Sequence, residues 1–129
     1  MVEDVIAALD IGTTAVKAAL VRGDGLIVET ASRSYGIETG PGGVMEQRPE
    51  AWWVAACEAM RACHPERFAV AALGLSGQMQ DLIAVAPSGP LRPAILYADT
   101  RAAQEAAQVE QVWGAERWQA TTGNLQDAS

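Results

Sequence analysis

The opening segment of the chain, residues 5–21, constrains the fold most, because it holds two strand patterns joined by a very short connection. Residues 5–9 are all apolar, which is typical of a buried strand. Residues 15–21 form a second strand pattern directly after Asp10-Ile11-Gly12-Thr13-Thr14. So short a connection between two strands predicts a β-hairpin at the start of the chain.

Further strand signals extend this hairpin into a sheet. The turn residues of Arg22-Gly23-Asp24-Gly25 precede an alternating pattern over residues 26–35, so we predict three antiparallel strands. Residues 68–75 are almost wholly apolar and predict a fourth strand. We expect that strand to lie inside a sheet that is covered on both faces.

One helix is predicted between the third and fourth strands. The glycine-rich residues 36–44 predict a loop, and Pro49 then begins a helix that ends near His64, before Pro65. The predicted packing stripe of this helix is Trp53, Cys57, Met60 and His64. Trp52 and Trp53 are predicted to pack against the protein, with stacking on a sugar ring as the alternative.

The last part of the chain predicts a hairpin and a helix. Residues 82–86 and 91–96 flank the turn-like Pro87-Ser88-Gly89-Pro90. Thr100 is predicted to be the N-cap of a helix that ends at Gly114, and a further helical turn is predicted over residues 115–121. Three antiparallel strands, a crossover helix and a further strand are compatible with an α/β, ribonuclease H-like core in one domain.

Composition and charge argue against several classes of partner. The formal net charge is −7, and no run of lysine or arginine could follow a nucleic-acid backbone. The apolar stretches fall short of the roughly 20 residues that span a bilayer. Glu3 and Asp4 stand where a secretory signal carries positive charge, so we expect a cytoplasmic protein. A single histidine and two cysteines do not supply the ligands of a structural zinc site.

The first hairpin combines residue types that suit a polyphosphate such as that of ATP. Gly12 lets backbone amides approach phosphate oxygens, Thr13 and Thr14 add hydroxyl donors, and Lys17 adds positive charge. Asp10 could hold Mg²⁺ beside the phosphates, directly or through water. The alternative is that Asp10 and Gly12 only shape a tight turn and that Lys17 is a solvated strand residue.

Four ordered blocks of the sequence resemble the FGGY family of carbohydrate kinases. They are residues 9–17 (LDIGTTAVK), 45–53 (MEQRPEAWW), 73–79 (LGLSGQM) and 93–101 (PAILYADTR). The resemblance implies an actin-like ATPase core, with ATP and Mg²⁺ as cofactors. It also implies that residues 1–129 are the N-terminal portion of the first domain of a two-domain sugar kinase. The C-terminal domain, with the general-base aspartate, would then lie outside this chain, which holds no catalytic base.

The third block resembles the sugar-binding loop of xylulokinase-like members. The resemblance implies that Gln78 and Met79 enter the sugar cleft, and Gln80 and Asp81 follow where hydroxyl-reading side chains would be useful. Met79 could instead be a core residue of an ordinary polar connection. Xylulokinases commonly have histidine and glycine where this chain has Gln80 and Asp81, which leaves the identity of the sugar open.

Asp99 and Arg101 lie in the fourth block and have two interpretations. They could contact the sugar or brace the cleft through an ion pair, or they could be surface charges beside a helix cap at Thr100. This block departs from xylulokinases at Tyr97 and Ala98, where those enzymes commonly have tryptophan and asparagine.

The resulting hypothesis is ATP-dependent phosphorylation of a small sugar or polyol, such as a xylulose-like ketose, by the full-length protein. We expect no turnover from residues 1–129 alone, and a homodimer of the full-length protein stays open. One alternative is a non-catalytic binding or assembly module with the same fold. Another is an actin-like ATPase that does not act on sugars, although the second and third blocks argue against it.

Overall fold

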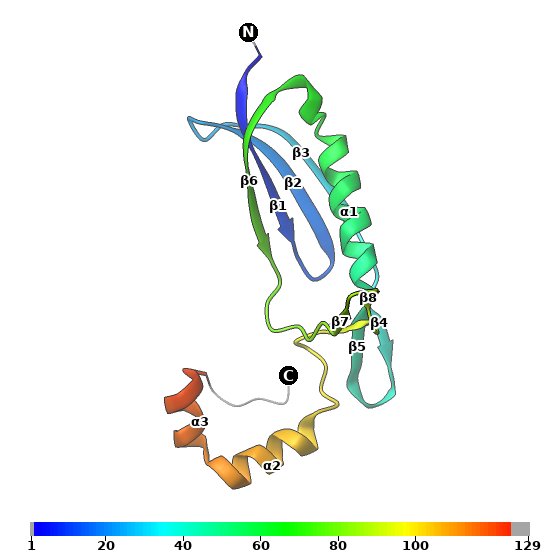
Figure 1. Cartoon of the computed structure of the whole chain (residues 1–129), viewed down its shortest axis with the longest axis vertical. Helices are drawn as coiled ribbons and strands as arrows, with labels where there is room; N and C mark the ends of the chain where they lie inside the picture. The colour runs from blue at the N-terminus through cyan, green and yellow to red at the C-terminus, as the bar shows by residue number, and fades with distance from the viewer. Residues whose placement is uncertain (1, 125–129) are drawn as a thin grey trace.

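The computed structural model describes residues 2–124 as a mixed sheet, a covering helix and a C-terminal pair of helices (Figure 1). The strands are β1 (Asp4–Ile11), β2 (Ala15–Arg22), β3 (Ile27–Ser34), β4 (Glu38–Gly40), β5 (Val44–Gln47), β6 (Ala69–Gly77), β7 (Val85–Ala86), β8 (Gly89–Pro90) and β9 (Ala94–Ile95). The α-helices are α1 (Pro49–Ala62), α2 (Ala103–Trp113) and α3 (Ala115–Thr122), and 3₁₀ turns cover Pro41–Gly43 and Pro65–Arg67.

The main sheet has the strand order β3-β2-β1-β6. The antiparallel pairing of β1, β2 and β3 confirms the three predicted strands. After the α1 crossover, β6 returns parallel to β1, with Asp10 beside Ser76 and Ile11 beside Gly77. Since β1 and β6 run in the same direction, the hairpin turn and the segment after Gly77 lie next to each other, at the C-terminal ends of these two strands.

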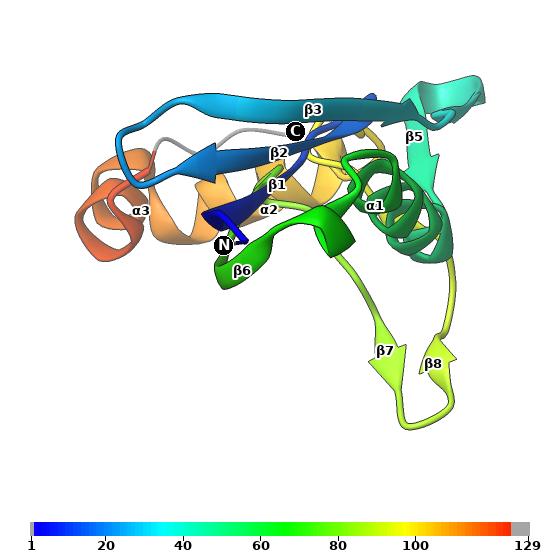
Figure 2. The same cartoon turned by 90° about the horizontal axis from the view of Figure 1, so that it is seen from above.

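Helix α1 lies against one face of the sheet (Figure 2), and alternate residues of β1 and β2 form the core under it. Their buried members are Val5, Ala7, Val16, Ala18 and Leu20. On α1 the buried residues are Ala55, Ala56 and Ala59, and Cys63 is buried directly after the helix. The predicted stripe was wrong at Trp53 and His64, which are exposed, whereas Met60 packs against the core. Trp53 is 72% exposed, because small side chains form the face of the helix that contacts the sheet.

Strand β6 was expected inside a sheet covered on both faces, and this expectation was wrong for the part of the chain that the structure describes. Leu73 and Leu75 are 56% and 68% exposed, although the strand and its pairing with β1 are confirmed. The reason is the position of α1, which packs over β1, β2 and β3 and leaves β6 at the sheet edge without a cover.

The predicted loop over residues 36–44 contains a small hairpin instead. Strands β4 and β5 pair around the Pro41–Gly43 turn, and β9 adds to the other side of β5. The hairpin-like prediction over residues 82–96 is confirmed only in part. The short β7–β8 pair projects away from the sheet in Figure 2, but β8 lies inside the predicted turn and β9 pairs with β5.

Thr100 does not cap α2, contrary to the prediction. Its backbone amide donates to the Gly43 carbonyl, and the N-cap of α2 is Ala102. Gly114 ends α2 with φ 72°, as predicted, and α3 follows directly. The edge-to-face rings of Trp113 and Trp118, with centroids 6.1 Å apart, join the two helices. Within residues 2–124 we find no helix with the length and apolarity that crossing a membrane requires.

Candidate phosphate and sugar site

The connection between β1 and β2 is a three-residue turn whose carbonyl groups all point to internal partners. The Gly12 carbonyl accepts a hydrogen bond from the Tyr35 hydroxyl, and the Thr14 carbonyl accepts one from the Tyr35 amide at 3.1 Å. The Thr13 carbonyl accepts a hydrogen bond from Gln47 Nε2 at 2.7 Å. The negative ends of these three peptide groups are therefore turned away from any ligand at the turn.

Two residues of the same turn, Thr13 and Thr14, keep their donors free. Gly12 N closes the turn on the Ala15 carbonyl at 3.1 Å, whereas the amides and hydroxyls of Thr13 and Thr14 make no hydrogen bond within residues 2–124. A Cβ at Gly12 would lie 3.3 Å from the Ala15 oxygen, so the tight closure favours glycine. Free backbone and hydroxyl donors beside carbonyls that are already engaged are the arrangement of an anion-binding turn.

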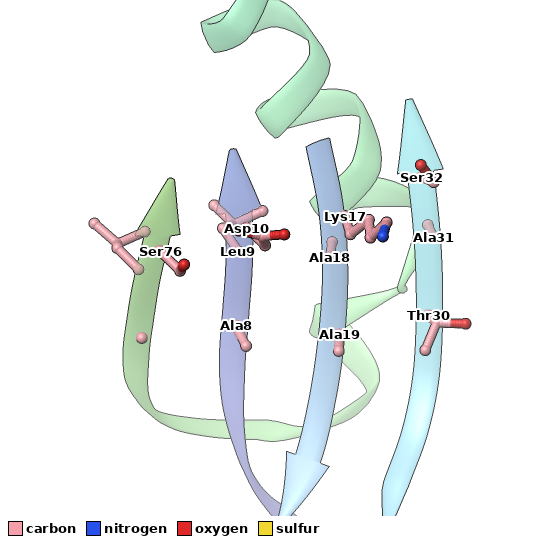
Figure 3. A pocket seen from close by; sticks show the side chains of 12 residues that line it. Ala8, Leu9, Asp10, Lys17, Ala18, Ala19, Thr30, Ala31, Ser32 and Ser76 are labelled. Carbon is pink, nitrogen blue, oxygen red and sulfur yellow. The ribbon is translucent and has the colours of Figure 1, made fainter. Parts of the chain in front are cut away.

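A polar row crosses the sheet beside this turn. Ser76 on β6, Asp10 on β1, Lys17 on β2 and Ser32 on β3 are register partners, and Figure 3 shows them on neighbouring strands. They line one side of a hollow of about 790 Å³ on the sheet face opposite α1. The rest of its lining is mainly small and apolar: Ala8, Leu9, Ala18, Ala19, Ala31, Gly74 and Leu75.

Asp10 and Lys17 are exposed, and their side chains make no hydrogen bond or ion pair in the described part of the chain. Residues 2–124 contain no cluster of three or more histidine, cysteine, aspartate or glutamate side chains that could enclose a metal ion. A lone, accessible carboxylate nevertheless fits Mg²⁺, which takes oxygen ligands and keeps several waters. The donor set therefore suits a magnesium ion that is also held by phosphate oxygens.

The predicted sugar loop lines a second hollow, of about 260 Å³, at the end of β6. Gln78, Gln80 and Asp81 line it together with Trp52, whereas Met79 does not line it and is 77% exposed. Gln78 Oε1 is buried and has no hydrogen-bond partner among residues 2–124. A buried acceptor without a partner is costly, and a hydroxyl donor would satisfy it.

The amide orientation of Gln78 is fixed by its neighbour. Gln78 Nε2 donates to Gln47 Oε1 at 3.3 Å, so a flipped Gln78 would bring two carbonyl oxygens together. Asp81 holds the opposite side of the loop, because its Oδ1 accepts a hydrogen bond from the Tyr97 amide at 2.9 Å. Gln80 adopts a positive φ of 66°, which turns the chain between these two anchors.

Asp99 and Arg101 form an internal ion pair. Asp99 is 6% exposed, and it accepts hydrogen bonds from the Met45 amide at 2.8 Å and from Arg101 Nε at 3.0 Å. Arg101 and Arg92 also pair with Glu46. The Arg101 guanidinium holds the pKa of the Asp99 carboxyl well below its usual range and also lowers the pKa of Glu46.

Three residues of this site were not among the predicted site residues: Tyr35, Gln47 and Trp52. The predicted residues came from turn chemistry and from the later blocks, whereas Tyr35 and Gln47 act through long-range hydrogen bonds and Trp52 acts through Gln47. The signal that could have found Gln47 is its place in the MEQRPEAWW block, as an uncharged amide just before a helix. Trp52 lines the sugar-loop hollow and donates its indole N–H to Gln47 Oε1 at 2.9 Å.

Solved structures with the same fold define the class of protein. A xyloylose kinase from Brucella ovis matches with a TM-score of 0.84 and 35% identity, over 96% of this chain and 26% of that chain. A xylulose kinase from Rhodospirillum rubrum matches with a TM-score of 0.87 and 27% identity, over 95% of this chain and 26% of that chain. The fold is the actin-like ATPase core of sugar kinases, which confirms the predicted ribonuclease H-like class.

The sequence comparisons narrow this class to one family. Residues 5–129 match the model of the N-terminal domain of the FGGY family of carbohydrate kinases. A xylulose kinase from Streptomyces rubiginosus is 32% identical over 127 residues, which are 96% of this chain and 26% of that protein. The chain therefore belongs to the FGGY family of carbohydrate kinases, and it spans about a quarter of the length of the curated relatives it matches.

Proposed function

We propose that the full-length protein transfers the γ-phosphoryl group of ATP to a hydroxyl of a small sugar or polyol, and that a xylulose-like ketose is the substrate. The hairpin turn carries this proposal, because all three of its carbonyls are engaged by Tyr35 and Gln47 while the donors of Thr13 and Thr14 remain available. Such a turn stabilises phosphate negative charge without rearranging, which is how phosphoryl transfer is mainly catalysed.

The proposed nucleotide-binding residues are those of the turn and of the row beside it: Asp10, Gly12, Thr13, Thr14 and Lys17. Thr13 and Thr14 would present donors to the phosphates, Gly12 would keep the turn tight so that they can approach, and Lys17 would add a positive charge from the adjacent strand. Asp10 would hold Mg²⁺ directly or through water, and the ion would neutralise the charge on the phosphates.

The proposed sugar-binding residues lie in the loop after β6. Gln78, Gln80 and Asp81 line the hollow there, and the partnerless Gln78 Oε1 offers an acceptor to a sugar hydroxyl. Met79 belongs to the same loop, and we include its exposed apolar side chain among the proposed sugar-binding residues. Asp99 and Arg101 are proposed to brace the cleft, since they pair with each other and Arg101 also pairs with Glu46.

The remainder of the mechanism is proposed to lie outside this chain. Residues 1–129 would form the N-terminal portion of the first domain, and a C-terminal domain would supply the general-base aspartate and most of the adenosine site. The cleft between the two domains would exclude water during transfer. We further propose that the protein is cytoplasmic and has no nucleic-acid or membrane partner. A homodimer of the full-length protein is compatible with this proposal.

The test is ADP formation by the purified full-length protein with Mg²⁺, ATP and a panel of ketopentoses, aldopentoses, hexoses and polyols. We expect sugar-dependent ADP release with one ketose well above the others, and loss of that release on chelation of Mg²⁺. Tight binding of a protein partner with no turnover on any panel member would instead support a non-catalytic module. ADP release that ignores every sugar would support an ATPase of another kind.

A further inference from the structure

The buried side chain of Gln47 lies between the phosphate turn and the sugar loop. Gln47 is the last residue of β5 and is 1% exposed. Its Nε2 donates to the carbonyls of Thr13, at 2.7 Å, and Gly36, at 3.2 Å. Its Oε1 accepts from Trp52 Nε1 at 2.9 Å and from Gln78 Nε2 at 3.3 Å.

These four contacts use the full hydrogen-bonding capacity of one carboxamide, which has two donors and an oxygen with two lone pairs. Of the side chains, only an amide can meet two carbonyl acceptors at one end and two N–H donors at the other. Glutamate has the same shape, but its carboxylate has no proton for the Thr13 and Gly36 carbonyls. Leucine has a related volume and makes none of the four bonds.

We infer that Gln47 is a positioning residue that fixes the distance between the phosphate turn and the sugar loop. This inference rests on the proposed function for its catalytic consequence. Gln47 touches the turn that would hold the γ-phosphate and the Gln78 side chain that would hold the sugar, yet its own amide is buried away from both ligands. It would therefore set the geometry of transfer without contacting a substrate.

The strand that carries Gln47 is itself held in place. Its neighbour Glu46 pairs with Arg92 and Arg101, and its backbone pairs with β9 through Ala94. The amide thus projects from an anchored strand and not from a free loop. Positioning from a rigid element matters, because a displacement of about 1 Å between reacting groups costs on the order of 10² in rate.

The experiment compares full-length wild type with Gln47→Glu and with a matched control, Gln104→Glu, at an exposed position on α2. We expect Gln47→Glu to lower kcat by about 10²-fold, while the KM values for ATP and sugar change less than about threefold. Gln104→Glu should match wild type in all three constants. An unchanged kcat for a folded Gln47→Glu protein would overturn the inference.

A second readout does not depend on turnover. Amide hydrogen exchange should rise together in the peptides that cover residues 12–15 and 78–81 of Gln47→Glu, and in neither peptide of the control. A rise in only one of these segments, or in neither, would contradict the role as a link. If the wild type phosphorylates no sugar, the proposed function fails and the exchange measurement still decides the role of Gln47.

A milder variant covers the case in which Gln47→Glu does not fold. Trp52→Phe keeps an aromatic ring and removes the indole donor to Gln47 Oε1, together with part of the ring surface at the hollow. We expect it to lower kcat by about three- to tenfold and to raise exchange in the same two segments by a smaller amount. A Trp52→Phe protein with wild-type kcat and exchange would overturn the inference in that case.

Discussion

Asp10 and Asp99 are both carboxylates within sequence blocks shared with sugar kinases, yet the structure uses them in opposite ways. Asp10 is exposed at the hairpin and has no hydrogen-bond or ion-pair partner among residues 2–124. Asp99 is 6% exposed and holds the Met45 amide and the Arg101 guanidinium. Whether a carboxylate already has internal partners therefore separates a candidate ligand-binding group from a brace, and sequence alone does not report it.

Removing the charge of Asp10 should have the largest effect on activity. Asp10→Asn in the full-length protein keeps the shape but loses the anionic Mg²⁺ ligand, so we expect kcat/KM for ATP to fall about 10²–10³-fold. Because the side chain has no internal partner, the unfolding temperature should stay within about 2 °C of wild type. Glu105→Gln on α2 serves as the control. A wild-type rate for Asp10→Asn would remove Asp10 from the proposed site.

Asp99→Asn should have the opposite effect to Asp10→Asn. We expect it to lower the stability of the fold more than it lowers the catalytic rate. We expect the unfolding temperature at pH 7 to fall by roughly 5 °C or more, because Arg101 loses one of its two carboxylate partners and keeps only Glu46. The folded pKa of Asp99 lies below the unfolded value, so its contribution is complete above about pH 4 and is lost as pH falls further.

The pH profile separates this prediction from a general defect. The difference in unfolding temperature between wild type and Asp99→Asn should stay constant from neutral pH to about pH 5 and shrink below about pH 4. Glu110→Gln, at an exposed position of α2, should show neither the loss nor the pH dependence. A difference that persists unchanged in acid would show that charge pairing is not its cause.

Gly43→Ala tests how closely the β4–β5 hairpin fits the segment that carries Asp99. Gly43 has φ +88°, and a Cβ there would lie 2.0 Å from Thr100 Oγ1. We expect a loss of about 1–3 kcal/mol in unfolding free energy, measured by denaturant titration. Gly23→Ala is the matched control, since that position has open space and no positive φ.

Adding Thr100→Ala to Gly43→Ala separates the two causes of the expected loss. The double variant removes the contact with Oγ1 and leaves the backbone strain at residue 43, so part of the stability should return. Full recovery would show that the positive φ costs nothing there. No loss in Gly43→Ala itself would show that the hairpin does not pack on Thr100 as described.

The strands were predictable where the signal is local. Apolar runs and turn residues locate β1, β2, β3 and β6, and Pro49 locates the start of α1. The buried face of α1 was not predictable, because its alanines are weaker hydrophobic signals than Trp53, which is exposed in the structure. The exposure of β6 could not be read from its composition either, since an apolar strand looks the same whether or not a helix covers it.

The same distinction between local and long-range signals applies to the candidate site. The tight turn between β1 and β2 was predictable from its glycine and threonines, and the ligand roles of Asp10 and the turn residues stay predictions. The roles of Tyr35 and Gln47 depend on contacts with residues 23 and 34 positions away, which no local pattern encodes. Likewise, the choice between sugar contact and brace for Asp99 depended on the Met45 amide, 54 positions away.

Tyr35→Phe should give the smallest effect and tests whether engaged carbonyls matter at the phosphate turn. The variant removes only the hydroxyl that donates to the Gly12 carbonyl and keeps the backbone bond to Thr14. Burial, followed by the nearby charges of Asp10 and Asp81, raises the pKa of Tyr35, so its hydroxyl keeps its proton at neutral pH. One such hydrogen bond contributes about 1 kcal/mol.

We therefore expect the KM for ATP of Tyr35→Phe to rise by about three- to sixfold with little change in kcat, because a released Gly12 carbonyl can turn toward the phosphates and repel them. Steady-state kinetics of the full-length protein measure this change. Tyr97→Phe is the matched control, since Tyr97 contacts Asp81 through its backbone amide and its ring hydroxyl makes no hydrogen bond within residues 2–124. Equal constants for the two variants would mean that the withdrawn Gly12 carbonyl does not contribute to nucleotide binding, and the donors of Thr13 and Thr14 would then have to account for it alone.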